Sequence, residues 1–307
     1  MNGLLILDKP SGITSHDAIH RLRRITGERS IGHLGTLDPL ATGVLPVLLG
    51  RFTRLAQFFA AAEKTYTGSI RFGFATDTWD ADGTPTTPAQ PIAFTAAQLH
   101  AAAASFLGDI LQTPPAYSAK KISGTPAHQL ARQGKPVELK PVPIRVSHFQ
   151  IESFAEDRAT FTLTVSSGGY IRSIAHSLGQ LLGCGAHLAT LRRTQAGVFT
   201  LTQSHPLAAL ERLAAENAAS PETKDSASSP AHEAIAQLCI HPRLMLPEFP
   251  SVTADEFTLG RLCNGAQVNL PEFTLAPTVK VFRSRDDLVA IAHRIAGTLF
   301  QPTIVLG

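Results

Sequence analysis

The residue best suited to do chemistry in this sequence is Asp38, which lies in a run of loop-forming and apolar residues, GHLGTLDPLATGVLPVLLG (32–50). Pro39 biases Asp38 away from helical backbone geometry, and Gly32, Gly35 and Gly43 permit tight turns and the close approach of a ligand. A carboxylate on such a stiff loop, directly before a buried strand, suits a catalytic group. An Asx turn, in which Asp38 accepts hydrogen bonds from nearby backbone N–H groups, fits the same residues.

A second residue with unusual placement is Arg172. The run Ser-Ser-Gly-Gly (166–169) indicates a turn, and the residues after it indicate a helix from Tyr170 to about Leu182. Arg172 therefore falls in the first helical turn, where a cation opposes the helix dipole. We expect it to have a partner, and a buried carboxylate is the obvious kind.

Tyr66 lies near the start of an alternating apolar segment, TYTGSIRFGFA (65–75), which predicts a strand. The period of two places Tyr66 on the same face as Ile70 and Phe72. A tyrosine in this setting usually packs in a core or an interface. At a strand end, however, an aromatic ring is also placed to stack on a nucleobase.

The segment 117–145 is the most basic part of the chain. It is rich in glycine and proline and contains one acidic residue, Glu138, against six basic ones: Lys120, Lys121, Arg132, Lys135, Lys140 and Arg145. Such a loop-rich basic insertion is the electrostatic footprint expected for a phosphate backbone. A solvated surface hairpin is the alternative.

Two patterns resemble metal sites, and neither is complete. His16 and His20 have the spacing of a helical metal pair, but no glutamate follows the first and no third ligand is evident. The loop 77–83 resembles a calcium loop, but Thr78 and Ala89 occupy positions that require acidic ligands. We therefore predict no metal site, and we expect 77–83 to be a polar hairpin loop in which a carboxylate holds a basic residue.

Bulk composition is that of a globular protein of the reducing cytoplasm. The chain of 307 residues is 44% hydrophobic, so it can bury a large core and a smaller one. It has no apolar run of about eighteen residues and no secretion signal at its start. Its three cysteines are widely separated, which argues against a disulfide scaffold. The net charge of +3 permits a polyanionic partner without requiring one.

The elements that must position these residues follow from periodicity and breakers. We expect strands at 3–7, 44–49, 65–75, 142–150, 158–165 and 198–200, and helices at 14–25, 52–62, 95–106 and 170–182. A low-complexity polar stretch within about 214–232 predicts a linker or surface loop. From about Phe249 the alternating segments 278–282, 288–292 and 303–306 indicate a small β-rich barrel.

Six blocks of sequence, in order, resemble the bacterial tRNA pseudouridine-55 synthases of the TruB family. These blocks are GHLGTLDPLATGVLP (32–46), KTY (64–66), TDTWDADG (76–83), PPAYSAKK (114–121), SGGYIRSIAHSLG (167–179) and GCGAHLATLRR (183–193). The resemblance runs from about residue 3 to residue 200, and its specificity comes from the agreement of separately spaced motifs.

The resemblance implies an α+β fold: a pseudouridine-synthase-type mixed, mainly antiparallel sheet flanked by helices, plus a small C-terminal PUA-like barrel. The catalytic domain would span 1–245, with an RNA-clamping insertion at about 117–145, and the PUA-like RNA-binding domain would span 246–307. Between Glu248 and Gly307, five basic residues face six acidic ones. Shape and backbone groups would therefore matter more than net charge if this domain touches RNA.

The resemblance also implies the site. Asp38 would be the catalytic aspartate, Arg172 its ion-pair partner and Tyr66 the residue against the target base. The implied substrate-binding residues are Lys9, Pro10, Gly32, His33, Tyr170, Leu191, Lys120, Lys121 and Arg132. His33 would occupy or stabilise the position that the base vacates, or else be a structural histidine bonded to loop backbone. An acidic residue expected near Ser177 is absent, because the chain has His176-Ser177 there.

The implied reaction converts a uridine in the tRNA T-loop (U55) to pseudouridine, without a cofactor or metal. It needs one carboxylate at the sugar, as a nucleophile on C1′, as a group that adds to the ring, or as a promoter of base loss. We expect Arg172 to keep Asp38 ionised, since an adjacent cation lowers a carboxyl pKa by roughly 1–3 units. The partner would be the T-arm of tRNA, with no membrane and no obligate protein partner, and the protein a monomer.

Two other functions share this scaffold. One is a non-catalytic protein that binds or folds tRNA, which would be expected to have lost Asp38, Tyr66 or Arg172. The other is an RNA-guided synthase within a ribonucleoprotein, which would be expected to carry a basic tail or docking extension. The sequence favours the stand-alone enzyme over both.

Overall fold

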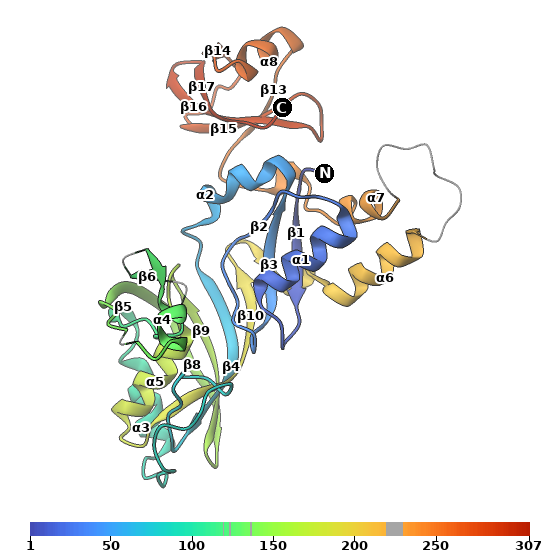
Figure 1. Cartoon of the computed structure of the whole chain (residues 1–307). Helices are drawn as coiled ribbons and strands as arrows, with labels where there is room; N and C mark the ends of the chain where they lie inside the picture. The colour runs from blue at the N-terminus through green and yellow to red at the C-terminus, as the bar shows by residue number, and fades with distance from the viewer. Residues whose placement is uncertain (119, 123, 136, 219–229) are drawn as a thin grey trace.

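A ten-stranded mixed sheet forms the body of the protein in the computed structural model, which describes residues 1–118, 120–122, 124–135, 137–218 and 230–307 (Figure 1). Its main path runs β12-β1-β3-β10-β4-β9-β8-β5, with β2 on β3 and β11 on β10. The strands are β1 (Gly3–Lys9), β2 (Ile31–His33), β3 (Thr42–Leu49), β4 (Lys64–Phe72), β5 (Gly108–Gln112), β8 (Val142–Ala155), β9 (Arg158–Val165), β10 (Ala186–Ala196), β11 (Phe199–Thr200) and β12 (His205–Pro206). Only the β1–β12 and β3–β10 pairs are parallel, so the predicted mixed, mainly antiparallel sheet is confirmed.

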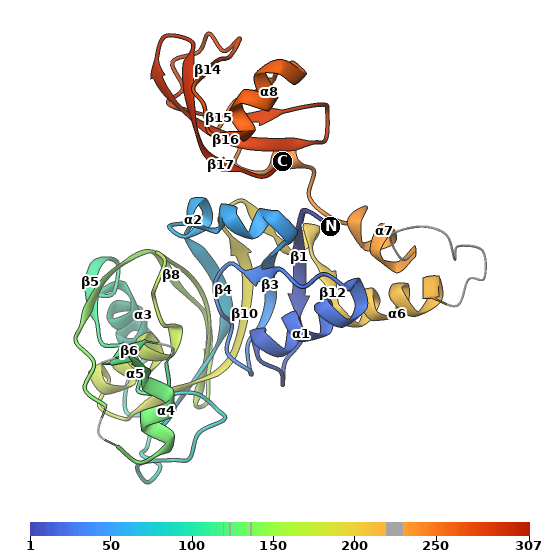
Figure 2. The same cartoon turned by 45° about the horizontal axis from the view of Figure 1, so that its top comes forward.

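Helices cover one face of this sheet in two groups. The groups are α1 (Ser15–Thr26), α6 (Leu207–Ala218) and α7 (Pro230–Ala236) beside β1, and α3 (Ala96–Ala104) and α5 (Ile171–Leu181) beside β8 and β10 (Figures 1 and 2). One continuous apolar core joins both groups to the sheet. Leu37 and Ala41 of the Asp38 loop are part of that core, so the loop lies where the two groups meet.

Alternation along the strands explains which face each side chain takes. In β1, Leu5 and Leu7 enter the core under the helices, whereas Leu4 and Ile6 enter a second core on the opposite face. Both faces of β1 and β3 are therefore buried, which is why these strands read as continuous apolar runs. In β4 the alternate residues Thr67 and Ser69 instead line a depression.

Local signals account for most element boundaries. Thr14 caps α1 in a reciprocal hydrogen-bonding pattern with Asp17, and Gly27 ends the helix in the left-handed conformation. The expected helix 52–62 is instead a 3₁₀ segment, η1 (Gly50–Leu55), followed by the short α2 (Ala56–Phe59). The strand β10 was not expected at all. It contains two register shifts that break its alternation.

The C-terminal part is a five-stranded half-barrel with its own core. Its elements are β13 (Ser251–Thr253), α8 (Glu256–Cys263), β14 (Val268–Asn269), β15 (Thr278–Phe282), β16 (Leu288–Ala296) and β17 (Leu299–Val305). The strand order is β13-β15-β16-β17-β14, and the three strands expected from alternation are β15, β16 and β17. A small β-rich barrel is thus confirmed (Figure 2).

This half-barrel packs on the first domain through a shared apolar core. Phe282, Ile291 and Ile304 lie in the same buried cluster as Leu4 and Phe52. Arg51 Nη1 donates to the carbonyl of Leu306 at 2.8 Å. The half-barrel thus covers one end of the sheet face opposite the helices.

Two segments singled out from the sequence are the basic insertion at 117–145 and the polar stretch at 214–232. The structure describes only part of the polar stretch. The insertion contains β6 (Lys121–Ile122), β7 (Thr125–Pro126) and α4 (Ala127–Arg132). The predicted linker at 214–232 overlaps α6 and α7 at its ends, and its middle, 219–229, lies outside the described residues. None of the helices in the described residues is long and apolar enough to cross a membrane.

Two glycines that flank the Asp38 loop allow a test of the packing. Gly43 has φ +103°, and a Cβ there would lie 2.2 Å from the Arg193 carbonyl oxygen; Gly12 has φ +83° and open space around it. We expect Gly12→Ala to cost about 1–2 kcal/mol from backbone strain alone. Gly43→Ala adds overpacking and should cost about 3 kcal/mol or more. Denaturant melts of both variants measure this, and equal stabilities would contradict the close β3–β10 contact.

Candidate active site

The Asp38 loop connects β2 to β3 and is held by several backbone contacts. Ser15 of α1 accepts from the Leu37 N–H at 2.8 Å and donates to the Leu37 carbonyl at 3.0 Å. A turn follows, in which the Ala41 N–H donates to the Asp38 carbonyl at 3.1 Å. The Asp38 carboxylate accepts from Arg172 and not, among the described residues, from a backbone N–H. An Asx turn therefore does not account for this aspartate.

Arg172 and Asp38 are brought together across the two helical groups. Arg172 Nη2 donates to Asp38 Oδ1 at 3.0 Å, and Nε lies 2.9 Å from Oδ2. The guanidinium is 6% exposed, whereas the Asp38 side chain keeps 32% of its surface open. The acid is thus oriented from its buried side and accessible from the other. Such an arrangement suits a carboxylate that must meet a substrate.

Two further segments hold the same guanidinium. Arg172 Nη1 donates to the Thr78 carbonyl at 3.1 Å, and Nη2 also donates to the Tyr117 carbonyl at 3.0 Å. Asp80 Oδ2 lies 3.5 Å from Nη1, and the Asp80 side chain is buried. The expectation that a carboxylate of the 77–83 loop holds a basic residue is therefore confirmed. Two carboxylates compensate a cation that the dipole of α5 disfavours.

The loop that carries Asp80 is fastened to α5 at a second point. The ring of Trp79 stacks on that of His176, with centroids 4.3 Å apart and an interplanar angle of 8°. Trp79 has φ +62°, a conformation that costs a non-glycine residue roughly 1–2 kcal/mol. His176 lies four residues after Arg172, on the same side of α5. The ring stack and the guanidinium contacts therefore both hold the Thr78–Asp80 loop against α5.

Burial and charge oppose one another at Asp38. Burial raises the pKa of the Asp38 carboxyl above its ordinary 3.8; Arg172 lowers that pKa, and the second carboxylate, Asp80, raises it. Arg172 thus lowers the pKa of Asp38, as expected, but the net direction is upward, which the expectation from this one partner left out. The reason is that loss of solvation around the acid outweighs the attraction of one guanidinium.

Lys9, the last residue of β1, supports the Asp38 loop. Its side chain is fully buried, and Nζ donates to the carbonyls of Pro10 at 2.8 Å and Ile13 at 2.7 Å. Burial lowers the pKa of Lys9 to about 8, although the negative charge of Asp38 opposes this. Pro10 is exposed and contributes its carbonyl to this arrangement. Lys9 thus belongs to the electrostatic surroundings of Asp38.

Tyr66 of β4 and Leu191 of β10 are buried in the same core cluster as Leu37. They are on the sheet face that bears the helices, as Asp38 is. The Tyr66 hydroxyl makes no hydrogen bond to another described residue. Tyr170 precedes α5, and its backbone N–H donates to Gln112 Oε1 at 2.7 Å. Burial raises the pKa of the Tyr170 hydroxyl, which lies close enough to Arg172 and Asp38 to feel their charges.

Gly32 and His33 form the end of β2, paired with β3. His33 Nδ1 is buried and has no hydrogen-bond partner among the described residues. Burial and the charge of Arg193 lower the pKa of His33, which favours the neutral ring. Both expected roles of His33, at the vacated base position or as a structural histidine, stay predictions.

The predicted basic contacts stand apart from this cluster. Lys121 lies in β6, Lys120 directly precedes that strand, and Arg132 ends α4. None of the three makes an ion pair with another described residue. Their segment begins at Tyr117, whose carbonyl binds Arg172, so the insertion is attached to the site by its first residues.

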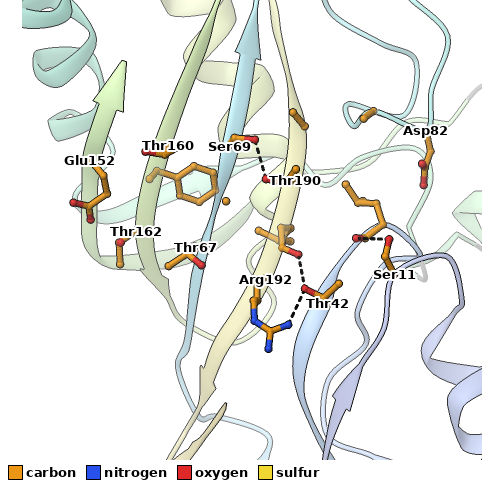
Figure 3. A pocket seen from close by; sticks show the side chains of 16 residues that line it. Ser11, Thr42, Thr67, Ser69, Asp82, Glu152, Thr160, Thr162, Thr190 and Arg192 are labelled. Carbon is orange, nitrogen blue, oxygen red and sulfur yellow. Dashed lines mark hydrogen bonds between the residues drawn. The ribbon is translucent and has the colours of Figure 1, made fainter. Parts of the chain in front are cut away.

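A depression of about 770 Å³ is lined by residues of β4, β9 and β10 and reaches Leu40 of the Asp38 loop. Figure 3 shows its hydroxyl lining, with Ser69 bonded to Thr190 at 2.8 Å and Arg192 bonded to Thr42 at 3.2 Å. Arg192 also pairs with Asp8 at 2.7 Å. Leu40 and Leu191 line the depression together with Ala81 and Asp82 of the loop that carries Asp80. The depression therefore borders the segments that follow Asp38 and Asp80 in the chain.

Comparison with protein families and known proteins finds similar chains along the whole length of this one. Residues 23–171 match the TruB family pseudouridylate synthase N-terminal domain, and residues 172–236 match the tRNA pseudouridylate synthase B C-terminal domain. The tRNA pseudouridine synthase B of Solibacter usitatus (strain Ellin6076) is 43% identical over 309 residues, covering 100% of both chains. That of Opitutus terrae (strain DSM 11246 / JCM 15787 / PB90-1) is 48% identical over 69% of this chain and 88% of the relative.

The chain belongs to the TruB family. As a member of the tRNA pseudouridine synthase B family it is an isomerase. The full-length match extends the resemblance beyond residue 200, where the sequence motifs had ended. The fold is also that of a chain in the crystal structure of a Cbf5-Nop10-Gar1 complex, with a TM-score of 0.68, 23% identity, and coverage of 99% of this chain and 85% of that one.

Several residues of this TruB-family site were not singled out from the sequence. Asp80 was anticipated only as an unspecified carboxylate, and Trp79 and His176 gave no signal for stacking, because their contact joins residues 97 positions apart. Arg193 was noted only as part of a motif. It is nonetheless buried and donates from Nε to the Val44 carbonyl at 2.6 Å, at the start of β3. A buried arginine with no acidic partner among the described residues is recognisable only once the sheet is assembled.

The raised pKa of Asp38 predicts the pH dependence of this isomerase. If the ionised carboxylate is the active form, kcat is lost as the pH falls through a pKa above 3.8. Asp80→Asn removes a charge that raises this pKa, so the acid limb of the kcat profile should move to lower pH. Asp82→Asn, at an exposed acid of the same loop, is the matched control and should leave the limb unchanged. An unmoved limb, or one moved to higher pH, in Asp80→Asn would contradict the assignment.

Proposed function

We propose that this chain converts uridine 55 in the T-loop of tRNA to pseudouridine, with Asp38 as the catalytic carboxylate and the target base turned out of the loop. The observation that carries the proposal is the Asp38–Arg172 ion pair, buried at the guanidinium and open at the acid. Membership of the TruB family supports tRNA as the substrate.

The reaction rearranges one glycosidic bond. The N1–C1′ bond breaks, the uracil turns, and a C5–C1′ bond forms, while C5 gives up one proton and N1 gains one. Atoms and electrons therefore balance within the nucleoside. Asp38 acts in one of three ways: by attack on C1′ of the ribose, by addition to the pyrimidine ring of the base, or by promoting loss of the base. Each way requires the ionised carboxylate beside the ribose.

The surroundings of Asp38 suit such a step. Leu37, Tyr66 and Leu191 provide an apolar floor that limits access of water to a detached base. Turning a base out of an RNA loop costs on the order of a few kcal/mol. Stacking of the base on Tyr66 contributes about 1–3 kcal/mol of stabilisation, by analogy with sites that bind single-stranded nucleic acids. The neutral His33, at the edge of the loop, is suited to occupy the position that the base leaves.

Binding of the T-arm is assigned to surfaces around this floor. Lys120, Lys121 and Arg132 provide cations without ion-pair partners among the described residues, as a clamp on RNA phosphates requires. We assign catalysis to residues 1–245 and RNA contacts of a PUA-like domain to 246–307. The protein is proposed to act in the cytoplasm as a monomer without a partner protein, on a T-arm recognised largely by shape.

Asp38→Asn tests the proposal against a non-catalytic tRNA-binding function. It should abolish pseudouridine formation on a tRNA transcript, measured by nearest-neighbour nucleotide analysis, while the Kd for the same transcript changes by less than a few fold. Asp157→Asn is the matched control, because Asp157 is 33% exposed and pairs with Arg71 at 2.6 Å far along the sheet.

The two variants give opposite expectations. Asp157→Asn should keep full turnover. Undiminished turnover in Asp38→Asn would overturn the catalytic assignment, and absence of turnover in the unmodified protein would favour the non-catalytic function instead.

A further inference from the structure

Arg193 carries a buried charge that no described acid neutralises. Its side chain is 1% exposed, and it donates to two backbone carbonyls, from Nε to Val44 at 2.6 Å and from Nη2 to Gly35 at 2.9 Å. No carboxylate of the described residues lies within ion-pair distance of it. Placing a cation in such a position is costly unless an opposite charge arrives.

Lys64 lies beside Arg193 and is likewise a cation with no acidic partner among the described residues. It begins β4 on the face of Tyr66, and its Nζ donates to the Ala62 carbonyl at 2.5 Å, with no acidic partner among the described residues. Burial and the charge of Arg193 both lower the pKa of Lys64. The pKa values of Lys9 and His33 are lowered by the same Arg193 charge, in addition to burial. One unneutralised cation thus acts on three neighbouring groups.

Gly35 is the point at which both cations approach the surface. A Cβ on Gly35 would lie 3.5 Å from Arg193 Nη1 and 3.8 Å from Lys64 Cε, so any side chain there would cover them. Gly35 is exposed, has φ +95°, and has none. Arg193 Nη1 has no hydrogen-bond partner among the described residues. The loop therefore leaves a donor and an ammonium beside an open backbone position.

We infer that one phosphate of the RNA backbone binds at Gly35, between Arg193 Nη1 and the ammonium group of Lys64. An RNA phosphodiester supplies the missing anion, and the absence of a side chain at Gly35 allows it to approach closely. Gly35 precedes Asp38 by three residues, which span at most about 11 Å. The phosphate therefore belongs to the target nucleotide or to a near neighbour. This inference rests on the proposed function for the identity of the RNA.

Lys64→Gln tests the site by the salt dependence of binding. For a T-arm RNA, the slope of log K against log [KCl] should fall in magnitude by about 0.7, the value for one phosphate contact on a single strand. Arg212→Gln, at an exposed cation of α6 away from the Asp38 loop, should leave the slope unchanged, and Lys64→Arg should restore it. Melting temperatures establish that the variants fold.

A scan with single methylphosphonates, which are uncharged, locates the contact. When the methylphosphonate replaces the phosphate that Lys64 contacts, near the target uridine, Lys64→Gln should no longer weaken binding. The negative charge that Lys64 would recognise is already absent from that RNA. A slope in Lys64→Gln equal to that of the unmodified protein, or an equal loss of affinity with every methylphosphonate RNA, would overturn the phosphate site. Pseudouridine formation by the unmodified protein on the same RNA is a separate readout. Its failure would count against the proposed function and leave the binding result intact.

Discussion

The ion pair between Asp38 and Arg172 is the interaction on which the site depends. The guanidinium contacts the Asp38 loop, the Thr78–Asp80 loop and the Tyr117 carbonyl, so three segments far apart in sequence are held by one side chain of α5. A buried cation in the first turn of a helix is unfavourable without such partners. The cost is offset by two carboxylates, and the result is an acid held from one side and open on the other.

The sheet makes this convergence possible because its two faces have different coverings. The half-barrel covers one end of the face opposite the helices, through the apolar residues of β1 and β3. Elsewhere the strands carry hydroxyl groups, such as the bonded pair Ser69 and Thr190, which line a depression. The helices cover the other face in two groups, and the Asp38 loop lies between them. Lys9 and Arg193 lie where the two helix groups meet. Both are buried cations, so positive charge is concentrated in the interior at this place.

The sequence could predict the parts of this arrangement that depend on neighbours along the chain. Capping by Thr14, the alternation of β4 and the need of Arg172 for an acidic partner all arise from local rules. The Asp38–Arg172 contact itself followed from the family resemblance, because 134 residues separate the two. The motif positions of Tyr66, Lys9 and Tyr170 came from the same source.

The features that sequence reasoning missed depend on tertiary structure. Register shifts in β10 hid a strand whose residues otherwise resemble a basic loop. The upward shift in the pKa of Asp38 depends on burial from several elements, which a pairwise argument with Arg172 leaves out. Likewise, the isolation of Arg193 from any described acid is a property of the assembled core.

The central claim is that Asp38 meets the ribose of a uridine whose base has left the RNA loop. A crystal structure of the Asp38→Asn variant with a T-arm RNA tests it most directly. The account predicts a uracil turned out beside Tyr66, with C1′ about 3–3.5 Å from the side chain of residue 38. A uridine still stacked within its loop, with its ribose beyond reach of that side chain, would contradict it.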